Sequence, residues 1–213
     1  MSYFTIKDEA TAEFKEKKSV FIGHGKRVEN EDEAKEFVQE IKNKHKQARH
    51  NVYAYIIGEN RNIQRYSDDG EPQGTGGIPM LEVLKKNDIT DVAVVVTRYF
   101  GGILLGTGGL ARAYSKGASL AIKEAGIVEK VKGVCIQIVI QYDLLGKMQH
   151  ICAENNFHIE HIDYTDTVKI KIYCEFSNIE EFKSKITGIS SGKAIFEEDA
   201  AKMYFKLEHR LYC

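Results

Sequence analysis

The chain has 213 residues, a formal net charge of −1 and 43% hydrophobic residues, and none of its apolar runs approaches the length of a membrane span. This composition excludes a disordered chain and a strongly basic protein that would attract nucleic acid over its whole surface. The first residues, MSYFTIKDEA, show no signal-peptide pattern, so we expect a cytoplasmic protein that does not use a membrane. The length fits one large domain or two small ones.

Cysteine usage bears on metal and redox chemistry. The four cysteines lie far apart in the sequence, and none of them forms a CxxC pair. This spacing predicts neither a zinc site nor a disulfide framework. We therefore expect no bound metal and no cofactor.

The charge is distributed unevenly along the chain. Residues 1–133 contain 21 Lys and Arg against 19 Asp and Glu, whereas residues 134–213 contain 9 against 12. A weakly positive first part and a negative second part place any anion-binding surface in the first part.

The first part predicts strands and helices in alternation. Strands are expected in SYFTIK, AEFKEK and SVFIGHGKRV, and a helix over 30–47, where Asn30 and Glu33 form a capping box. NVYAYIIG and NIQRYS predict a hairpin, and IPMLEVLKK a short helix. The β-branched run DVAVVVTRYF predicts a central strand covered on both faces. A helix from about Thr107 to Ala125 follows, and the small residues on its packing face predict that it lies very close to the sheet.

The second part has a simpler pattern. After GIVEKVK, which is either a last strand or a linker, GVCIQIVIQY predicts a strand and DLLGKMQHICAENN a helix capped by Asp143. Two alternating strands, a helix capped by Asn178 and a final strand follow, and KAIFEE is a candidate for a short strand before the last one. The order β-α-β-β-α-β is that of the ferredoxin-like split βαβ unit. We therefore predict an α+β protein with domains over residues 1–133 and 134–213.

Two glycine-rich stretches stand out in the first part. The first is DDGEPQGTGGIPM (68–80) and the second lies within RYFGGILLGTGGLARAY (98–114). Ten of the 18 glycines fall between residues 70 and 117, and both prolines fall in the first stretch. Such a concentration indicates either tight turns with close packing or backbone amides left open for a ligand.

Known nucleotide motifs do not explain the second stretch. Gly101 and Gly106 have the spacing of a P-loop, but Thr107 and Gly108 follow where Lys-Ser/Thr is required. The letters of a dinucleotide-binding GxGxxG/A motif are present at 106–111, but the expected strand ends about eight residues too early.

An anion site at the start of the long helix is the hypothesis that remains. Free N–H groups and the positive end of the helix dipole point outward there, and glycine lets an anion approach the backbone. Arg98 precedes the loop, and Arg112, Lys116 and Lys123 form a stripe on the helix. The alternative is that the glycines serve only turns and packing. The predicted anion- or nucleic-acid-binding residues are Arg98, Gly101, Gly102, Gly106, Thr107, Gly108, Gly109, Arg112 and Lys116.

A possible secondary site contains the acids of the first stretch and one histidine. Asp68, Asp69 and Glu71 have the chemistry of Mg²⁺ ligands, although such strings are more often turns with solvated carboxylates. His50 is either a catalytic base or a structural residue. No serine or cysteine has a base visible in the sequence, so nucleophilic catalysis has no support. Tyr66, Tyr99 and Phe100 are candidates to stack on bases, with core packing as the alternative.

Four segments together resemble a known family. KKSVFIG (17–23), ARHNVYAY (48–55), SDDGEPQGTGGIP (67–79) and TRYFGGILLGTGGLARAY (97–114) closely resemble the IMPACT family, also called the YigZ or UPF0029 family. The resemblance to its bacterial two-domain members covers essentially the whole chain. Two departures are Gly76, where the family has alanine, and Val20, where arginine is common.

The resemblance implies both a fold and a role. It implies a first domain similar to ribosomal protein S5 domain 2 and a second similar to the last domain of elongation factor G, a pair that works on the ribosome. Eukaryotic relatives restrain a translation-regulating kinase through its activator. We therefore expect a regulatory protein that binds RNA, the ribosome or another anionic partner, with a protein partner in translation control as a further possibility. The alternative is a metal-dependent hydrolase, because some relatives carry a proline-dipeptidase label.

Overall fold

The computed structural model describes residues 2–212, which form a mixed α+β protein of two compact units. The first unit is Tyr3–Val128, and the second contains Ser2 and the chain from Glu129 onward. Among the described residues, no helix is both long enough and apolar enough to cross a membrane.

The first unit contains an antiparallel sheet in the order β2-β3-β6-β4-β5. A short strand, β1 (Ser2–Ile6), precedes it. The five strands are β2 (Ala10–Glu16), β3 (Ser19–Arg27), β4 (His50–Ile57), β5 (Ile63–Ser67) and β6 (Val92–Tyr99). The β-branched strand β6 is central, and its residues Val92–Arg98 are buried, as the sequence predicts.

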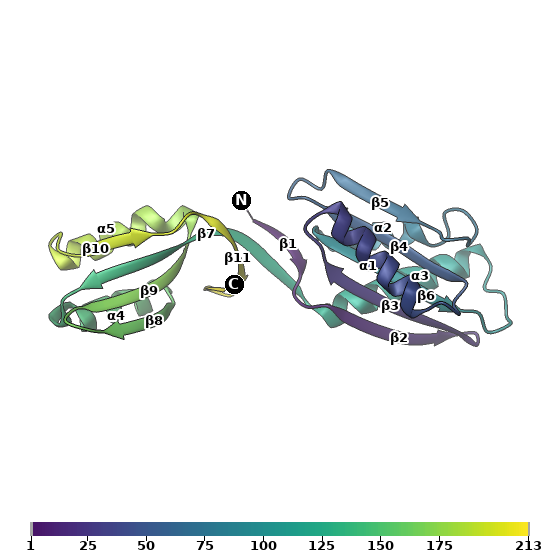
Figure 1. Ribbon diagram of the computed structural model, residues 1–213, viewed down its shortest axis with the longest axis horizontal. Helices are drawn as coiled ribbons and strands as arrows, with labels where there is room; N and C mark the ends of the chain where they lie inside the picture. The colour runs from purple at the N-terminus through teal and green to yellow at the C-terminus, as the bar shows by residue number, and fades with distance from the viewer. Residues whose placement is uncertain (1, 213) are drawn as a thin grey trace. The chain divides into compact units, whose positions relative to one another are not determined.

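Helices cover both faces of this sheet (Figure 1). The helix α1 (Glu31–Lys44) packs on one face, and α2 (Gly77–Lys86) and α3 (Thr107–Ala125) pack on the other. The predicted capping box starts α1: Glu33 N donates to Asn30 Oδ1 at 2.9 Å, and Glu33 Oε2 accepts from Glu29 N at 2.8 Å.

The helix α3 lies very close to the sheet, as its small residues predict. A Cβ atom at Gly23 of β3 would lie 2.3 Å from the Gly117 carbonyl oxygen of α3. The buried face of α3 includes Ala113, Ala118 and Ala121. This close packing fixes where α3 begins relative to the end of β6, and the second glycine-rich stretch connects these two points.

The second unit pairs its strands in the order β12-β11-β7-β9-β8, and β10 also pairs with β7. Two helices bury their apolar faces against this sheet. Its elements are β7 (Ile127–Ile140), α4 (Leu145–Glu154), β8 (Ile159–Tyr164), β9 (Val168–Glu175), α5 (Ile179–Ser190), β10 (Ile195–Glu198), β11 (Lys202–Leu207) and β12 (Arg210–Tyr212).

Two local features of the second unit differ from the sequence predictions. GIVEKVK and GVCIQIVIQY form one continuous strand of 14 residues, because the backbone from Glu129 onward pairs with β11. Neither predicted side-chain cap forms: Asp143 lies in a 3₁₀ turn, Tyr142–Leu144, that leads into α4, and Asn178 is the N-cap residue of α5 but makes no side-chain capping bond. Cys135, Cys152 and Cys174 are free and buried, and Cys213 lies outside the described residues.

Candidate functional site

The first glycine-rich stretch folds around the carboxylate of Asp68. Its Oδ1 accepts hydrogen bonds from the backbone N of Gly76 and Gly77 at 2.9 and 2.8 Å, and its Oδ2 accepts one from Gly74 N at 2.8 Å. Burial raises the pKa of Asp68, but the three N–H donors outweigh it and hold the pKa below 3.8. Asp68 therefore anchors the loop at the start of α2 and has its oxygens committed to protein.

Asp69 ties the same stretch to β4 and α1. Its carboxylate accepts from Asn51 N at 2.7 Å and from Lys42 Nζ at 2.6 Å. The Asp69 carbonyl oxygen lies 2.9 Å from His50 Nδ1. Because a carbonyl only accepts, Nδ1 carries the proton and Nε2 is the ring nitrogen left for a ligand.

Glu71 and Arg98 form a buried ion pair below the two stretches. Glu71 Oε1 accepts from Arg98 Nη1 and from the Tyr114 hydroxyl, both at 2.7 Å, and the side chains of Glu71 and Arg98 are only 4% and 5% exposed. Burial, followed by the bond to Glu71, raises the pKa of Tyr114 above its usual value. The Arg98 guanidinium also lies over the rings of Phe21 and Phe100.

The ion pair with Glu71 gives Arg98 a different role from the one predicted. The sequence predicts Arg98 as a positive charge on the anion surface, whereas in the structure its charge is neutralised by Glu71 in the core. The physical reason is that Arg98 points to the face of the sheet that α2 and α3 cover. Arg98 therefore packs in the core, and its charge is not available to an anion at the start of α3.

The predicted secondary site does not assemble as a set of metal ligands. His50 contacts the first stretch, which contains the three acids. The acids, however, accept hydrogen bonds from backbone amides, Lys42, Arg98 and Tyr114. Within residues 2–212, no three His, Cys, Asp or Glu side chains are grouped so that they could hold a metal ion.

The second glycine-rich stretch leaves the start of α3 open. Gly106 is the N-cap residue at φ 71°, where a side chain would be strained, and it makes no side-chain capping bond. Leu110 N donates to Gly106 O, which closes the first helical turn. Within the described chain, the N–H groups of Thr107, Gly108 and Gly109 have no hydrogen-bond partner.

Gly101 and Gly102 form the turn that leads to this helix. A Cβ at Gly101 would lie 2.0 Å from the Lys18 carbonyl oxygen, and Gly101 N donates to Ser19 Oγ at 3.2 Å. Gly102 has φ 85° and no neighbour within 4 Å of a built Cβ. These two glycines therefore serve close packing and a turn, which is the alternative that the sequence leaves open for the glycines.

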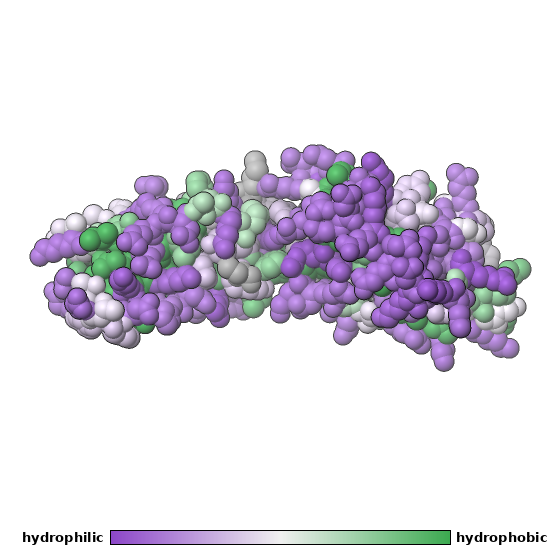
Figure 2. Space-filling model, in the orientation of Figure 1, coloured by the Kyte–Doolittle hydropathy of each residue, from purple (hydrophilic) through white to green (hydrophobic). Residues whose placement is uncertain are grey.

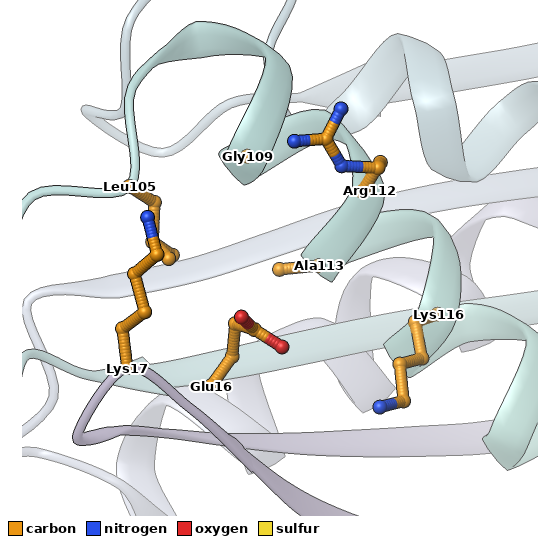
Figure 3. A pocket seen from close by; sticks show the side chains of 7 residues that line it. All are labelled: Glu16, Lys17, Leu105, Gly109, Arg112, Ala113 and Lys116. Atoms are coloured by element: carbon orange, nitrogen blue, oxygen red, sulfur yellow. The ribbon is translucent and has the colours of Figure 1, made fainter.

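A basic hollow of about 250 Å³ lies beside the first turn of α3 (Figure 3). Arg112 and Lys116 project from α3, and Lys17 rises from the β2–β3 turn toward Leu105. Arg112 Nη1 is 3.7 Å from the position of a Cβ at Gly108, so this cation lies at the open helix start. The hollow is lined by Glu16, Lys17, Leu105, Gly109, Arg112, Ala113 and Lys116.

The cations of the basic hollow are available to a ligand. Arg112 and Lys116 are exposed, as is Lys17, and none of the three forms an ion pair within the described residues. Lys116 Nζ lies over the Phe14 ring, 4.5 Å from its centroid. Three cations face a single acid, Glu16, so the hollow is positive.

A second hollow, the apolar cavity, shares Leu105 with the basic hollow and has a volume of about 380 Å³. Both glycine-rich stretches contribute to its walls. Pro72, Phe100, Leu104, Leu105 and Leu110 are its apolar residues, and Arg49, His50, Glu71, Arg98, Gly106 and Thr107 complete it. Leu104 is 83% exposed and Phe100 is 45% exposed. Green atoms appear at this end of the first unit, where the β6–α3 loop lies (Figure 2).

The predicted site residues thus lie apart in the structure. Asp68 and Asp69 hold the first stretch in place, and Gly101 and Gly102 form the turn before α3. Thr107, Gly108 and Gly109 form the open helix start, together with Arg112 and Lys116 of the basic hollow. His50, Glu71 and Arg98 line the apolar cavity. Of the candidate stacking residues, Phe100 lines the cavity, Tyr99 is half-buried beside His45, and Tyr66 packs against Gly77.

Lys17 lines the basic hollow and Arg49 lines the apolar cavity, and neither was among the predicted site residues. Lys17 and Lys18 form a two-residue turn with φ 43° and 69°, and the pairing of Val20 with Tyr99 places this turn at the end of β6. The sequence does indicate a tight turn between two predicted strands, but it does not indicate how β3 pairs with β6 and hence where the turn lies.

The structure also accounts for the glycine at position 76. A Cβ there would lie 2.8 Å from Val52 Cγ1 and 3.3 Å from Tyr114 Cδ2. An alanine at this position would therefore require Val52 to move.

Comparison with protein families matches both units. Residues 17–122 match the Impact N-terminal domain, and residues 138–193 match a domain of unknown function, DUF1949. The first match contains both glycine-rich stretches, the apolar cavity and every residue of the basic hollow except Glu16.

Individual proteins are similar over most of the chain. The chain is 45% identical over 197 residues to the IMPACT family member YvyE of Bacillus subtilis, covering 92% of this chain and 91% of the relative. It is 33% identical to the IMPACT family member YigZ of Escherichia coli, covering 83% and 87%. A protein IMPACT homolog of Dictyostelium discoideum is 40% identical over 94 residues, which cover 43% of this chain and 27% of the relative.

A solved structure is also similar. A crystal structure described as that of a hypothetical protein matches with a TM-score of 0.60 and 30% identity, covering 92% of this chain and 96% of the other.

Proposed function

The chain belongs to the IMPACT family, and from this premise we propose that its first unit binds single-stranded RNA at the open start of α3 and the basic hollow. One observation carries the proposal: three unpartnered N–H groups at the start of α3 adjoin a hollow lined by three cations that form no ion pair within the described residues. Helix N-termini and cationic side chains are the groups that hold phosphate oxygens.

The shape of the positive surface favours a polymer over a single anion. The cations extend from Lys17 across the hollow to Arg112 and Lys116, and the stripe continues along α3 to the exposed Lys123. A run of separated cations suits a backbone of successive phosphates. The net charge of −1 means that this attraction is local and does not come from the whole protein.

The proposed setting is regulation of translation in the cytoplasm. The chain is 40% identical over 94 residues to the Dictyostelium IMPACT homolog, and this membership of one family supports a regulatory role. We propose that the first domain, residues 1–133, is similar to ribosomal protein S5 domain 2. The second, residues 134–213, is then ferredoxin-like, like the last domain of elongation factor G. The strand order β10-β7-β9-β8 with two helices supports the second assignment.

The test is RNA binding by the double variant Arg112→Ala with Lys116→Ala. Binding of a fluorescently labelled single-stranded RNA is measured by anisotropy at several salt concentrations. Each phosphate contact contributes about 0.7 to the slope of log affinity against log salt, so losing two contacts should reduce the slope by about 1.4. The variant should also bind more weakly while it remains folded.

The matched control is Lys85→Ala with Lys86→Ala on α2. It makes the same change in net charge in the same unit, and neither residue lines the hollow. Unchanged affinity and salt slope in the Arg112/Lys116 variant would overturn the proposal.

A further inference from the structure

The apolar cavity has a polar floor that the RNA-phosphate proposal does not use. At this floor, Glu71 Oε1 is occupied by Arg98 Nη1 and the Tyr114 hydroxyl. Within the described chain, Glu71 Oε2 and Arg98 Nη2 have no hydrogen-bond partner. Neither atom is sealed from solvent, unlike Arg98 Nε, which is buried and unpartnered. The cavity therefore offers an acceptor and a donor from two side chains that are themselves almost fully buried.

The charge of this floor selects the kind of group that fits it. Glu71 and Arg98 neutralise each other, so the floor does not attract a second anion as a lone arginine would. Its complement is a neutral group that carries an N–H donor beside an acceptor. The edges of nucleobases carry this combination.

The walls of the cavity suit a flat ring. Phe100 is 45% exposed and lies on the Arg98 guanidinium, and Pro72, Leu104 and Leu110 complete an apolar lining. Unpaired RNA bases are bound by stacking on aromatic rings or guanidinium planes and by hydrogen bonds at their edges. The volume of about 380 Å³ is at the small end of the range for small-molecule pockets.

The cavity and the phosphate surface adjoin each other. Leu105 lines both the apolar cavity and the basic hollow, and Gly106 and Thr107 of the helix start line the cavity. The two places therefore adjoin, as a base and its own phosphate lie on either side of one ribose.

We propose that the apolar cavity binds one unpaired nucleobase of the RNA, with the phosphate of the same nucleotide at the first turn of α3. This proposal rests on the proposed function, because the strand must first be held by the phosphate contacts. It adds recognition of a base to binding that otherwise depends on charge alone.

The experiment compares a six-nucleotide RNA with an abasic strand that has the same number of phosphates. Stacking is worth a factor of about 5 to 150 per base, so the wild-type protein should bind the RNA more tightly than the abasic strand by a factor in that range. Phe100→Ala should remove the difference while the abasic strand binds as before. Leu104→Glu, at a residue that is 83% exposed, should also reduce RNA binding without disturbing the core.

Ile103→Ala is the control, because Ile103 is on the same loop and 40% exposed but does not line the cavity. It should leave the preference for RNA unchanged. Equal binding of both strands by the wild-type protein would overturn the base proposal and leave the phosphate proposal standing. Failure of both strands to bind would overturn both proposals.

Discussion

The two glycine-rich stretches use their backbone amides in opposite ways. In the first stretch, Asp68 accepts bonds from three backbone N–H groups, and Gly76 and Gly77 are buried. In the second, the N–H groups of Thr107, Gly108 and Gly109 have no partner in the described chain, and the first two residues are exposed.

The difference shows that glycine content alone does not indicate a binding site. Both stretches lead into a helix, α2 or α3, and both helices begin without a side-chain cap from their own N-cap residue. The Asp68 carboxylate from the preceding loop accepts bonds from the amides at the start of α2, whereas within the described chain no carboxylate accepts one from the first amides of α3. At α2 the Asp68 carboxylate occupies the position in which an anionic ligand would bind, and at α3 that position is open.

The largest expected effect is on stability, from Asp68→Ala. This change removes three charge-assisted bonds and leaves the buried amides of Gly76 and Gly77 without a partner. We expect the free energy of unfolding to fall by about 4 kcal/mol, measured by urea denaturation. Asp8→Ala is the control, because its carboxylate is 70% exposed and 4.0 Å from Lys7, and should cost less than about 0.5 kcal/mol. A loss below about 1 kcal/mol for Asp68→Ala would show that the first stretch does not depend on this carboxylate.

The pH dependence of stability distinguishes the Asp68 carboxylate of the first stretch from His24, a buried residue of β3. Burial, followed by repulsion from His45 and Lys44, lowers the pKa of His24 from 6.5 to about 4. Between these values the unfolded state binds more protons, so stability is complete above pH 6.5 and falls as the pH falls toward 4. The loss should be about 3 kcal/mol, and His24→Leu should flatten it.

Asp68 behaves differently in the same pH window. Although burial raises its pKa, its three N–H donors hold that pKa below the ordinary value, so its contribution is present above the unfolded-state pKa and is lost only at lower pH. The effect of Asp68→Ala should therefore change little between pH 6.5 and 5, the upper part of this window. An Asp68→Ala effect that shrinks across this window would contradict the account of the first stretch.

The smallest expected effect on stability distinguishes the two helix starts. A Cβ at Gly77 of α2 would lie 2.8 Å from Tyr66 Cδ2 and 3.0 Å from Ser67 N, so Gly77→Ala should lower the melting temperature. A Cβ at Gly108 of α3 would meet only Arg112 Nη1, at 3.7 Å. Gly108→Ala should therefore stabilise the protein by about 0.5 kcal/mol but weaken RNA binding, because the methyl group covers the open amides. Equal melting temperatures for the two variants would show that the starts of α2 and α3 do not differ in how tightly they are packed.

The sequence predicted most of the fold because its local signals agree with one another. Asn30 and Glu33 start α1, the β-branched run forms the covered strand β6, and the small residues of α3 indicate its close approach to the sheet. The continuity of β7 was not predictable in the same way. Its first half is held by pairing with β11, about 70 residues later in the chain, and short-range patterns carry no information on such a partner.

The candidate site was predicted in part for a similar reason. The open start of α3 follows from a local feature, namely the glycines at the position where the helix begins. The state of Arg98 depends on Glu71, 27 residues earlier, and on the face of the sheet to which it points. Lys17 joins the hollow only through the register of β3 against β6. These are tertiary facts that a charge pattern does not contain.

The most direct test of the central claim is an NMR titration of the isotopically labelled protein with single-stranded RNA. The account predicts that the amide signals of Thr107, Gly108 and Gly109 shift as RNA binds. Those of Gly74, Gly76 and Gly77 should stay in place, because Asp68 already holds them. Shifts confined to the first stretch, or no shift at the start of α3 under conditions where RNA binds, would contradict the account.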